Sequence, residues 1–168
     1  MTPLTRFWES PTRPWYLIIP QSGKPIAVIP SIGEALMSKT WVEDIRTWPS
    51  PDLTDDGINL LSETLNEVAK KNRVGIPSGA ETHVRIPRND LIKLTQNVNL
   101  SHDYEIVKNL RMIKSKEEII KIEKACMIAK EAFGRVPEIA SENIQLDEVF
   151  RRFQVLCLEA GADWVPYL

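Results

Sequence analysis

The sequence predicts an α/β fold with a mixed sheet flanked by helices, and three observations support this. Short β-type runs alternate with helical segments along residues 15–107. Repeated units of this kind place helices on the faces of a sheet. A hairpin at the start adds an antiparallel pair, so the sheet is mixed rather than purely parallel. The composition, 43% hydrophobic and 26% charged over 168 residues, is that of an ordinary globular chain.

The first predicted elements are two short strands, at residues 15–19 and 26–29. Both runs are rich in β-branched and aromatic residues, and the Ser22-Gly23 pair between them favours a hairpin. Residues 31–39 fit a short helix. An imperfect alternation over residues 41–48 then predicts a third strand.

The period changes from Thr54 onward, which predicts an amphipathic helix. Thr54 or Asp55 is placed to cap its N-terminus. A short strand at 73–77, a helix at 88–96 and one or two strands within 98–107 complete the alternating pattern. The apolar positions of the first helix recur at three and four residues, at Ile58, Leu61, Leu65 and Val68.

Residues beyond 107 are charged and helical. Ser115 and Glu118 have the spacing of a capping box, and Gly161 lies at the C-cap of a second helix. The sequence therefore predicts two domains, residues 1–110 and 111–168. The first helix carries an apolar stripe of Ile119, Ile122, Cys126, Ala129 and Phe133, and the second carries Leu146, Val149, Phe150, Phe153, Leu156 and Ala160.

Charge, hydropathy and cysteine use narrow the possible functions. A net charge of −2 gives no reason to expect nucleic acid as a partner. No apolar run approaches the roughly 20 residues that span a bilayer, and the first residues lack a secretory apolar core. Cys126 and Cys157 are expected to be free, buried thiols, which favours the cytoplasm. His83 and His102 are expected to be surface or hydrogen-bonding residues rather than metal ligands.

Residues 110–133, LRMIKSKEEIIKIEKACMIAKEAF, resemble the junction of the creatinase and Xaa-Pro dipeptidase family, the pita-bread metallopeptidases. Upstream, WYLIIPQSGKPIAVIP is similar to the paired strands of that family's N-terminal domain, and RVGIPSGAETH is similar to a later strand with the helix behind it. LDEVFRRFQVLCLEAGADWVPYL is similar to the second helix of the catalytic domain and the strand after it. The resemblance covers nearly the whole chain.

The resemblance implies a ribonuclease H-like, creatinase N-terminal α/β domain whose first helix and strand are missing. Two helices follow that open an incomplete pita-bread domain, truncated before the family's five metal ligands. This chain is then expected to hold no cofactor. The parent enzyme would use two divalent ions (manganese, zinc, cobalt or iron), or none in creatinase-like members, and would act on a peptide or on a small amidino or amino-acid compound.

A loop at the start of the chain is the candidate contact site. It combines rigid aromatic and cationic groups, which are common at interfaces. In the family such loops help build the subunit interface and reach a substrate pocket, so Arg6, Trp8 and Arg13 are predicted to contact substrate or partner. The alternative is that Trp8 and Trp15 simply cover the sheet edge.

Two functions stay open from the sequence. The first is the non-catalytic N-terminal portion of a metallohydrolase, which supplies homodimer or higher oligomer contacts and pocket walls. The second is a stand-alone protein-interaction module with the same fold. A small-molecule binder is disfavoured, since no phosphate-binding glycine motif is present. The apolar end, residues 164–168, is predicted to begin a strand that further strands would cover.

Overall fold

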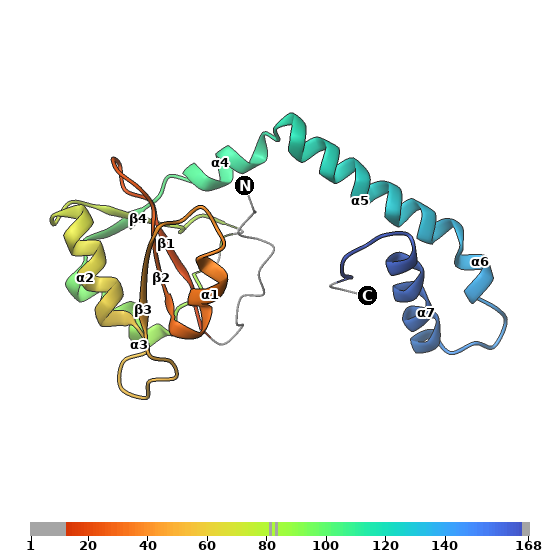
Figure 1. Cartoon of the computed structure of the whole chain (residues 1–168), viewed down its shortest axis with the longest axis horizontal. Coiled ribbons are helices and arrows are strands. Elements are labelled where there is room, and N and C mark those ends of the chain that lie inside the picture. Colours follow the sequence, from red (N-terminus) through yellow and green to blue (C-terminus); the bar gives the residue numbers. More distant parts are fainter. Residues whose placement is uncertain (1–12, 81, 83, 166–168) are drawn as a thin grey trace. The chain divides into compact units, whose positions relative to one another are not determined.

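The structure is a computed structural model that describes residues 13–80, 82 and 84–165. The chain divides into two compact units, Met1–Lys108 and Asn109–Leu168. All strands of the described residues belong to the first unit, as Figure 1 shows. The first unit is mixed α/β, whereas the second is built from helices.

A three-stranded sheet opens the first unit. Strand β1 (Tyr16–Ile18) pairs antiparallel with β2 (Ile26–Pro30), so that Leu17 lies opposite Ala27. Strand β3 (Asp44–Trp48) pairs in parallel with β2 on its other side. The hairpin predicted from the sequence is therefore confirmed.

Helices cover both faces of this sheet. Ile26 and Val28 of β2 belong to a cluster with residues of α2 and α3, whereas Ala27 and Ile29 pack with α1. Successive strand residues point to opposite faces, so β2 is buried along its whole length. Figure 1 shows α1 and α2 on opposite sides of the strands. The helical elements of this unit are η2 (Ser31–Gly33), α1 (Glu34–Met37), α2 (Ile58–Ala69) and α3 (Arg88–Asn97).

A second, two-stranded sheet lies in the same unit. Strand β4 (Val74–Ile76) pairs in parallel with β5 (Leu100–His102). Parallel neighbours need a crossover connection, and α3 lies within it. The strands and their flanking helices confirm the mixed α/β fold class that the sequence predicts.

The third strand begins later than predicted. It starts at Asp44 rather than Trp41. The Val42 amide donates a hydrogen bond to the Thr40 hydroxyl over 3.2 Å, and the Val42 side chain is only 3% exposed. Residues 40–42 therefore form a turn into the core rather than an extended strand.

Within residues 98–107, only Leu100–His102 form a strand, so the second strand considered for this range is not formed. Tyr104 and Glu105 have φ angles of 53° and 59°, which end the extended run. Helix α4 (Ile106–Met112) begins directly afterwards. The β-branched pair Ile106-Val107 therefore lies in a helix, against its local strand preference.

Local signals define the helices of the second unit. The Ser115 hydroxyl accepts from the Glu118 amide (3.2 Å), and the Glu118 carboxylate accepts from the Ser115 amide (2.7 Å), so the predicted capping box is confirmed. Gly161, with φ of 101°, follows the C-cap residue Ala160 directly. The helices are α5 (Lys116–Gly134), α6 (Val136–Ile139) and α7 (Leu146–Glu159).

The core of the second unit is small. Phe133 and Phe153 place their ring centroids 4.8 Å apart, but Ile119, Ile122 and Phe133 of the predicted stripe are 45%, 48% and 65% exposed. Most of the stripe on α5 therefore lies outside this core. The buried residues of the cluster are Ala132, Ile139, Leu156 and Cys157.

The two cysteines differ in burial, so the expectation that both are buried is wrong for one of them. Both are free, and Cys157 is buried as predicted, but Cys126 is exposed. The reason is the size of the core, to which α5 contributes Ala132 and not the stripe that contains Cys126.

The end of the chain is described only in part. Trp164 is 60% exposed, and Val165 packs against the small core. Residues 166–168 lie outside the described residues, so the strand expected to begin at 164–168 stays a prediction. None of the described helices is long and apolar enough to cross a membrane.

Candidate functional site

Of the three predicted contact residues, Arg13 is the first residue that the structure describes, and Arg6 and Trp8 lie outside the described residues. The Arg13 guanidinium forms an ion pair with the Asp56 carboxylate. Their side chains are 30% and 25% exposed, so the pair is partly shielded from solvent. Arg13 is therefore anchored to the loop between β3 and α2.

Asp56 holds several groups of this corner together. Its Oδ1 atom accepts hydrogen bonds from Trp48 Nε1 (2.9 Å) and from the Ser50 hydroxyl (3.3 Å). Trp48 is only 5% exposed. Because its indole N–H is satisfied inside the core, Trp48 can be buried without an unpaired donor.

Gly57 permits the close approach of this loop to the core. Its φ is 92°, a left-handed conformation that glycine adopts without penalty. A Cβ atom at this position would lie 2.4 Å from the Trp48 ring. The loop can therefore pass over Trp48 only with a glycine here.

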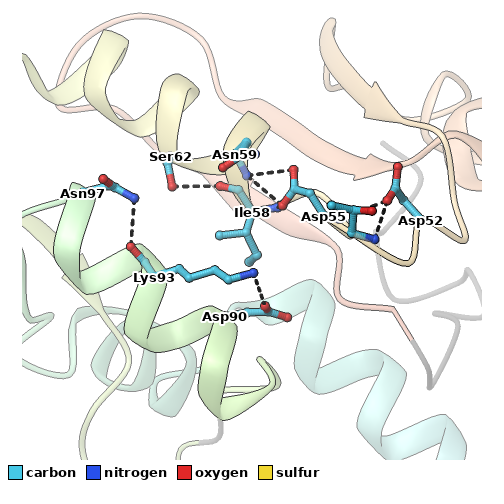
Figure 2. A network of polar contacts seen from close by, with 9 residues as sticks. Asp52, Asp55, Ile58, Asn59, Ser62, Asp90, Lys93 and Asn97 are labelled. Atoms are coloured by element: carbon cyan, nitrogen blue, oxygen red, sulfur yellow. Dashed lines mark hydrogen bonds and ion pairs between the residues drawn. The ribbon is translucent and has the colours of Figure 1, made fainter.

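Figure 2 shows how the loop enters α2. The Asp55 carboxylate accepts from the backbone amides of Ile58 (3.1 Å) and Asn59 (3.2 Å), so Asp55 satisfies amides at the helix start as predicted. Thr54 does not; its amide donates to the Asp52 carboxylate at 2.7 Å. Hydrogen bonds from the amides of Asp55 and Thr54 lower the pKa of Asp52.

The other contacts in Figure 2 are internal to helices. The Ser62 hydroxyl donates to the Ile58 carbonyl at 2.8 Å, and the Asn97 amide donates to the Lys93 carbonyl at 3.0 Å. Lys93 and Asp90 approach to 3.7 Å on α3. These groups stabilise α2 and α3 and form no convergent set of catalytic groups.

Trp15 has a structural role, but it packs on a face of the sheet rather than at the edge that the alternative expected. It packs against the cluster that contains Ala27 and Ile29. A Cβ atom on Gly33 would lie 2.4 Å from the Trp15 ring. The ring therefore covers one face of the sheet, and the corresponding question for Trp8 falls outside the described residues.

The first unit contains a second candidate, a cavity of about 650 Å³ between β1 and β4. Residues 14–21 line one border and residues 72–77 line the other. Leu61, Leu65 and Leu94, each at most 7% exposed, line the helical side. The volume falls in the range of about 300–1,000 Å³ that is typical of ligand pockets.

The described charged side chains that line this cavity are all basic. Its described lining includes Arg73 and Arg85 and no Asp or Glu. The Tyr16 hydroxyl is buried without a hydrogen-bond partner among the described residues. Burial raises the pKa of Tyr16, with smaller contributions from the charges of Asp90 and Asp56. No local sequence pattern predicts this cavity, because its two borders are far apart along the chain.

The described side chains form no cluster of metal ligands. Within the described ranges, no group of three or more His, Cys, Asp or Glu residues could hold a metal ion. His102 is a hydrogen-bonding residue, as predicted, since its Nδ1 atom accepts from the Tyr104 amide at 2.6 Å. His83 lies outside the described residues. The two-metal centre implied for the parent enzyme does not fit these residues, and we assign them no hydrolytic step.

Comparison with known proteins places the fold. No protein-family model matches the chain, and none of the curated proteins matches it. Among solved structures, it is similar to a prolidase from Thermococcus sibiricus, with a TM-score of 0.74 and 23% identity over 92% of this chain and 41% of that chain. It is also similar to the dipeptidase PepE from Mycobacterium ulcerans, with a TM-score of 0.68 and 21% identity over 91% and 40% of the chains.

A third similar structure is the X-Pro aminopeptidase from Thermotoga maritima, with a TM-score of 0.65 and 20% identity. That match covers 86% of this chain and 38% of the aminopeptidase. The chain therefore has a fold found in Xaa-Pro peptidase structures and spans about two fifths of their length.

Proposed function

We propose that this chain is the N-terminal, non-catalytic portion of a metallohydrolase similar to creatinase and Xaa-Pro dipeptidase. The observation that carries the proposal is the match to the Thermococcus sibiricus prolidase, which covers 92% of this chain but 41% of that protein. A match of nearly all of one chain to part of another is expected of a portion of a longer enzyme. The junction sequence at residues 110–133 supports the same relationship.

In the complete enzyme, this portion would supply contacts between subunits and walls of the substrate pocket. The ion pair between Arg13 and Asp56 supports such a role, because it anchors one of the three predicted contact residues to the folded first unit. Arg6 and Trp8 of that loop remain the proposed contacts to substrate or to a neighbouring subunit. A homodimer or larger homo-oligomer is the proposed assembly.

Catalysis belongs to the rest of the proposed enzyme. Metal-dependent hydrolases of this kind use bound divalent ions to activate water and polarise the scissile group. The ligands for the ions would come from outside the described residues, and the substrate would be a peptide or a small amidino or amino-acid compound.

The proposal is tested at the gene and then with the protein. We expect the reading frame to continue beyond codon 168 and to encode Asp, His and Glu ligands. The full-length product should hydrolyse Xaa-Pro dipeptides or a related compound with Mn²⁺ or Co²⁺, whereas residues 1–168 should show no turnover above a metal-only blank. Comparable turnover by residues 1–168 would contradict a non-catalytic role.

The alternative is a stand-alone protein-interaction module. Exposed apolar side chains in the second unit favour it, including Ile113 (83%), Ile120 (63%) and Met127 (63%), because contiguous apolar surface often marks an interaction site. A stop codon directly after codon 168, together with an intact mass that matches residues 1–168, would support this alternative over the enzyme portion.

A further inference from the structure

A tight turn joins strand β5 to helix α4. It consists of residues 102–105, which we call the β5–α4 turn. Tyr104 and Glu105 both have a left-handed backbone, with φ angles of 53° and 59°. This conformation is unfavourable for residues other than glycine, and residues held in it depend on the groups around them. The acceptors that bind this turn therefore decide whether α4 can begin at Ile106.

Two neighbouring residues supply those acceptors. The Tyr104 amide donates a hydrogen bond to His102 Nδ1 over 2.6 Å. The next two amides both donate to Asp103, that of Glu105 to Oδ1 over 3.1 Å and that of Ile106 to the carbonyl oxygen over 3.3 Å. An α-helix leaves its first amides without partners inside the helix. Here the amides of residues 104–106 are bound by atoms of the two residues that precede them.

The His102 imidazole is the acceptor whose state changes with pH near neutrality. Histidine side chains gain or lose their charge between about pH 5 and 8. Nδ1 accepts a hydrogen bond only in the neutral ring that carries its proton on Nε2, and it becomes a donor when the ring is protonated. Two donors cannot remain facing each other over 2.6 Å. Protonation of His102 therefore breaks the hydrogen bond that holds the Tyr104 amide.

Asp103 offers the protonated ring another partner. Its Oδ1 atom lies 3.5 Å from His102 Nδ1, and the carboxylate is largely shielded, with a side chain that is 12% exposed. A protonated Nδ1–H can pair with this carboxylate in a charge-assisted hydrogen bond. The same Oδ1 atom accepts from the Glu105 amide, so the new pair competes with a second bond of the turn. Neutral and protonated His102 therefore favour different arrangements of the same residues.

The elements packed against the β5–α4 turn supply no other titratable group to the imidazole. Strand β4, which pairs with β5, has the sequence Val-Gly-Ile, and the described residues after it, 77–80 and 82, are also not titratable. On the turn itself, the Tyr104 ring lies with its centroid 5.5 Å from that of His102. Glu105 pairs with Lys108 over 3.1 Å. Among the described residues, Asp103 is thus the carboxylate within ion-pair distance of His102.

We propose that the β5–α4 turn is a pH-dependent switch, in which neutral His102 holds the turn that starts α4, and protonated His102 pairs with Asp103 and releases it. The hold is present at the upper end of the range in which histidine titrates and is lost as the pH falls through it. The chain passes from its first unit to its second within α4, so the switch loosens that connection at low pH. This inference is independent of the proposed hydrolase role, because neither state requires a substrate.

The first experiment measures amide exchange with solvent by NMR on residues 1–168, corrected for the intrinsic pH dependence of exchange. Protection of the Tyr104 amide is expected to fall about two- to tenfold from pH 8 to pH 5, as for the loss of one hydrogen bond. The Glu118 amide is the matched control, because it donates to the Ser115 hydroxyl, which does not titrate. Constant protection of Tyr104, or an equal fall at Glu118, would overturn the proposal.

His102→Asn separates the acceptor from its charge. An Asn side-chain oxygen can accept from the amide two residues further on and does not titrate. Tyr104 protection in this variant is expected to stay near the parent's value at pH 8 over the whole range, whereas His102→Ala should lose about two- to tenfold at every pH. The His102 side chain is 44% exposed, so neither change disturbs the core. Equal losses in both variants, or a pH dependence that persists in His102→Asn, would contradict the switch.

Two further variants test the partner and the identity of the titrating group. Asp103→Asn keeps an oxygen for the Glu105 amide but removes the charge that pairs with the protonated ring, so Tyr104 protection at pH 6 should be about twofold higher than in the parent. Lower or unchanged protection would show that Asp103 does not take part. His83 is the chain's other histidine, and His83→Asn should leave the pH dependence unchanged. Loss of the pH dependence in His83→Asn would assign it to His83 and overturn the proposal.

Discussion

The two units of the chain are stabilised in different ways. Residues 13–108 bury apolar clusters on both faces of a sheet, whereas the described part of the second unit buries a cluster of four residues. The second unit instead shows strong local helix signals, including the capping box at Ser115. Tertiary packing therefore defines the first unit, and local helix chemistry defines much of the second.

The largest expected effect on stability comes from replacing a buried isoleucine of the first unit, compared with an exposed isoleucine of the second. Ile29 in β2 is fully buried, and Ile122 in α5 is 48% exposed. We expect Ile29→Ala to lower the free energy of unfolding by about 2–5 kcal/mol, because it removes buried methyl groups and leaves a cavity. Ile122→Ala should change it by less than about 0.5 kcal/mol. Urea titration measures both, and equal effects would show that the stripe on α5 is buried in solution.

Two glycines test the same difference through the backbone. Gly57→Ala is expected to cost about 1–3 kcal/mol, since φ is 92° and the added Cβ meets Trp48. Gly134→Ala, at the end of α5, meets nothing within 4 Å and should stabilise by about 0.4–1 kcal/mol. Thermal unfolding compares the two variants. A neutral Gly57→Ala would contradict the close packing of the loop on Trp48.

The N-terminal caps of α2 and α5 should contribute equally to the stability of their units. Asp55→Ala removes the acceptor for the first amides of α2, and Ser115→Ala breaks the capping box of α5. Each is expected to cost about 1 kcal/mol. Helical circular dichroism during urea titration gives the loss, with Asp55→Asn and Ser115→Thr as conservative controls that keep a capping oxygen. Losses in the controls as large as those in the alanine variants would argue against capping as the cause.

The smallest expected effect is on pH dependence. Hydrogen bonds from Arg46 lower the pKa of Glu67 in the first unit, and a hydrogen bond from its own amide, with one from Ser115, lowers that of Glu117 in the second. A lowered folded-state pKa gives stability that is full above the unfolded value of about 4.3 and is lost as the pH falls through the folded value. Stability should therefore decline below about pH 4.5, and Glu67→Gln or Glu117→Gln should flatten that decline. An unchanged slope in both variants would exclude these carboxylates as its source.

The sequence was most informative where local chemistry decides the structure. The spacing of Ser115 and Glu118 predicted the capping box, and the Ser22-Gly23 pair predicted the hairpin, because both motifs act within a few residues. Local preference failed at Ile106, which lies in a helix after two residues with positive φ. Nothing in the identity of Tyr104 or Glu105 indicates that conformation, since neither is glycine.

The candidate sites show the same limit. Arg13 was predicted from the density of cationic and aromatic groups around it, but its partner Asp56 is 43 residues away and is brought close only by the fold. The exposure of Cys126 depends on how little of α5 the small core covers. The cavity between residues 16–18 and 74–76 also depends on tertiary arrangement, which no local pattern encodes.

The connections between paired strands have a consequence for the order of folding. Only residues 19–25 separate β1 from β2, whereas residues 77–99 separate β4 from β5. Closing the longer connection costs more chain entropy, and non-local pairing is slower. We expect the hairpin to form early and the β4–β5 pair late. The two-stranded sheet would then be the last part of the first unit to assemble.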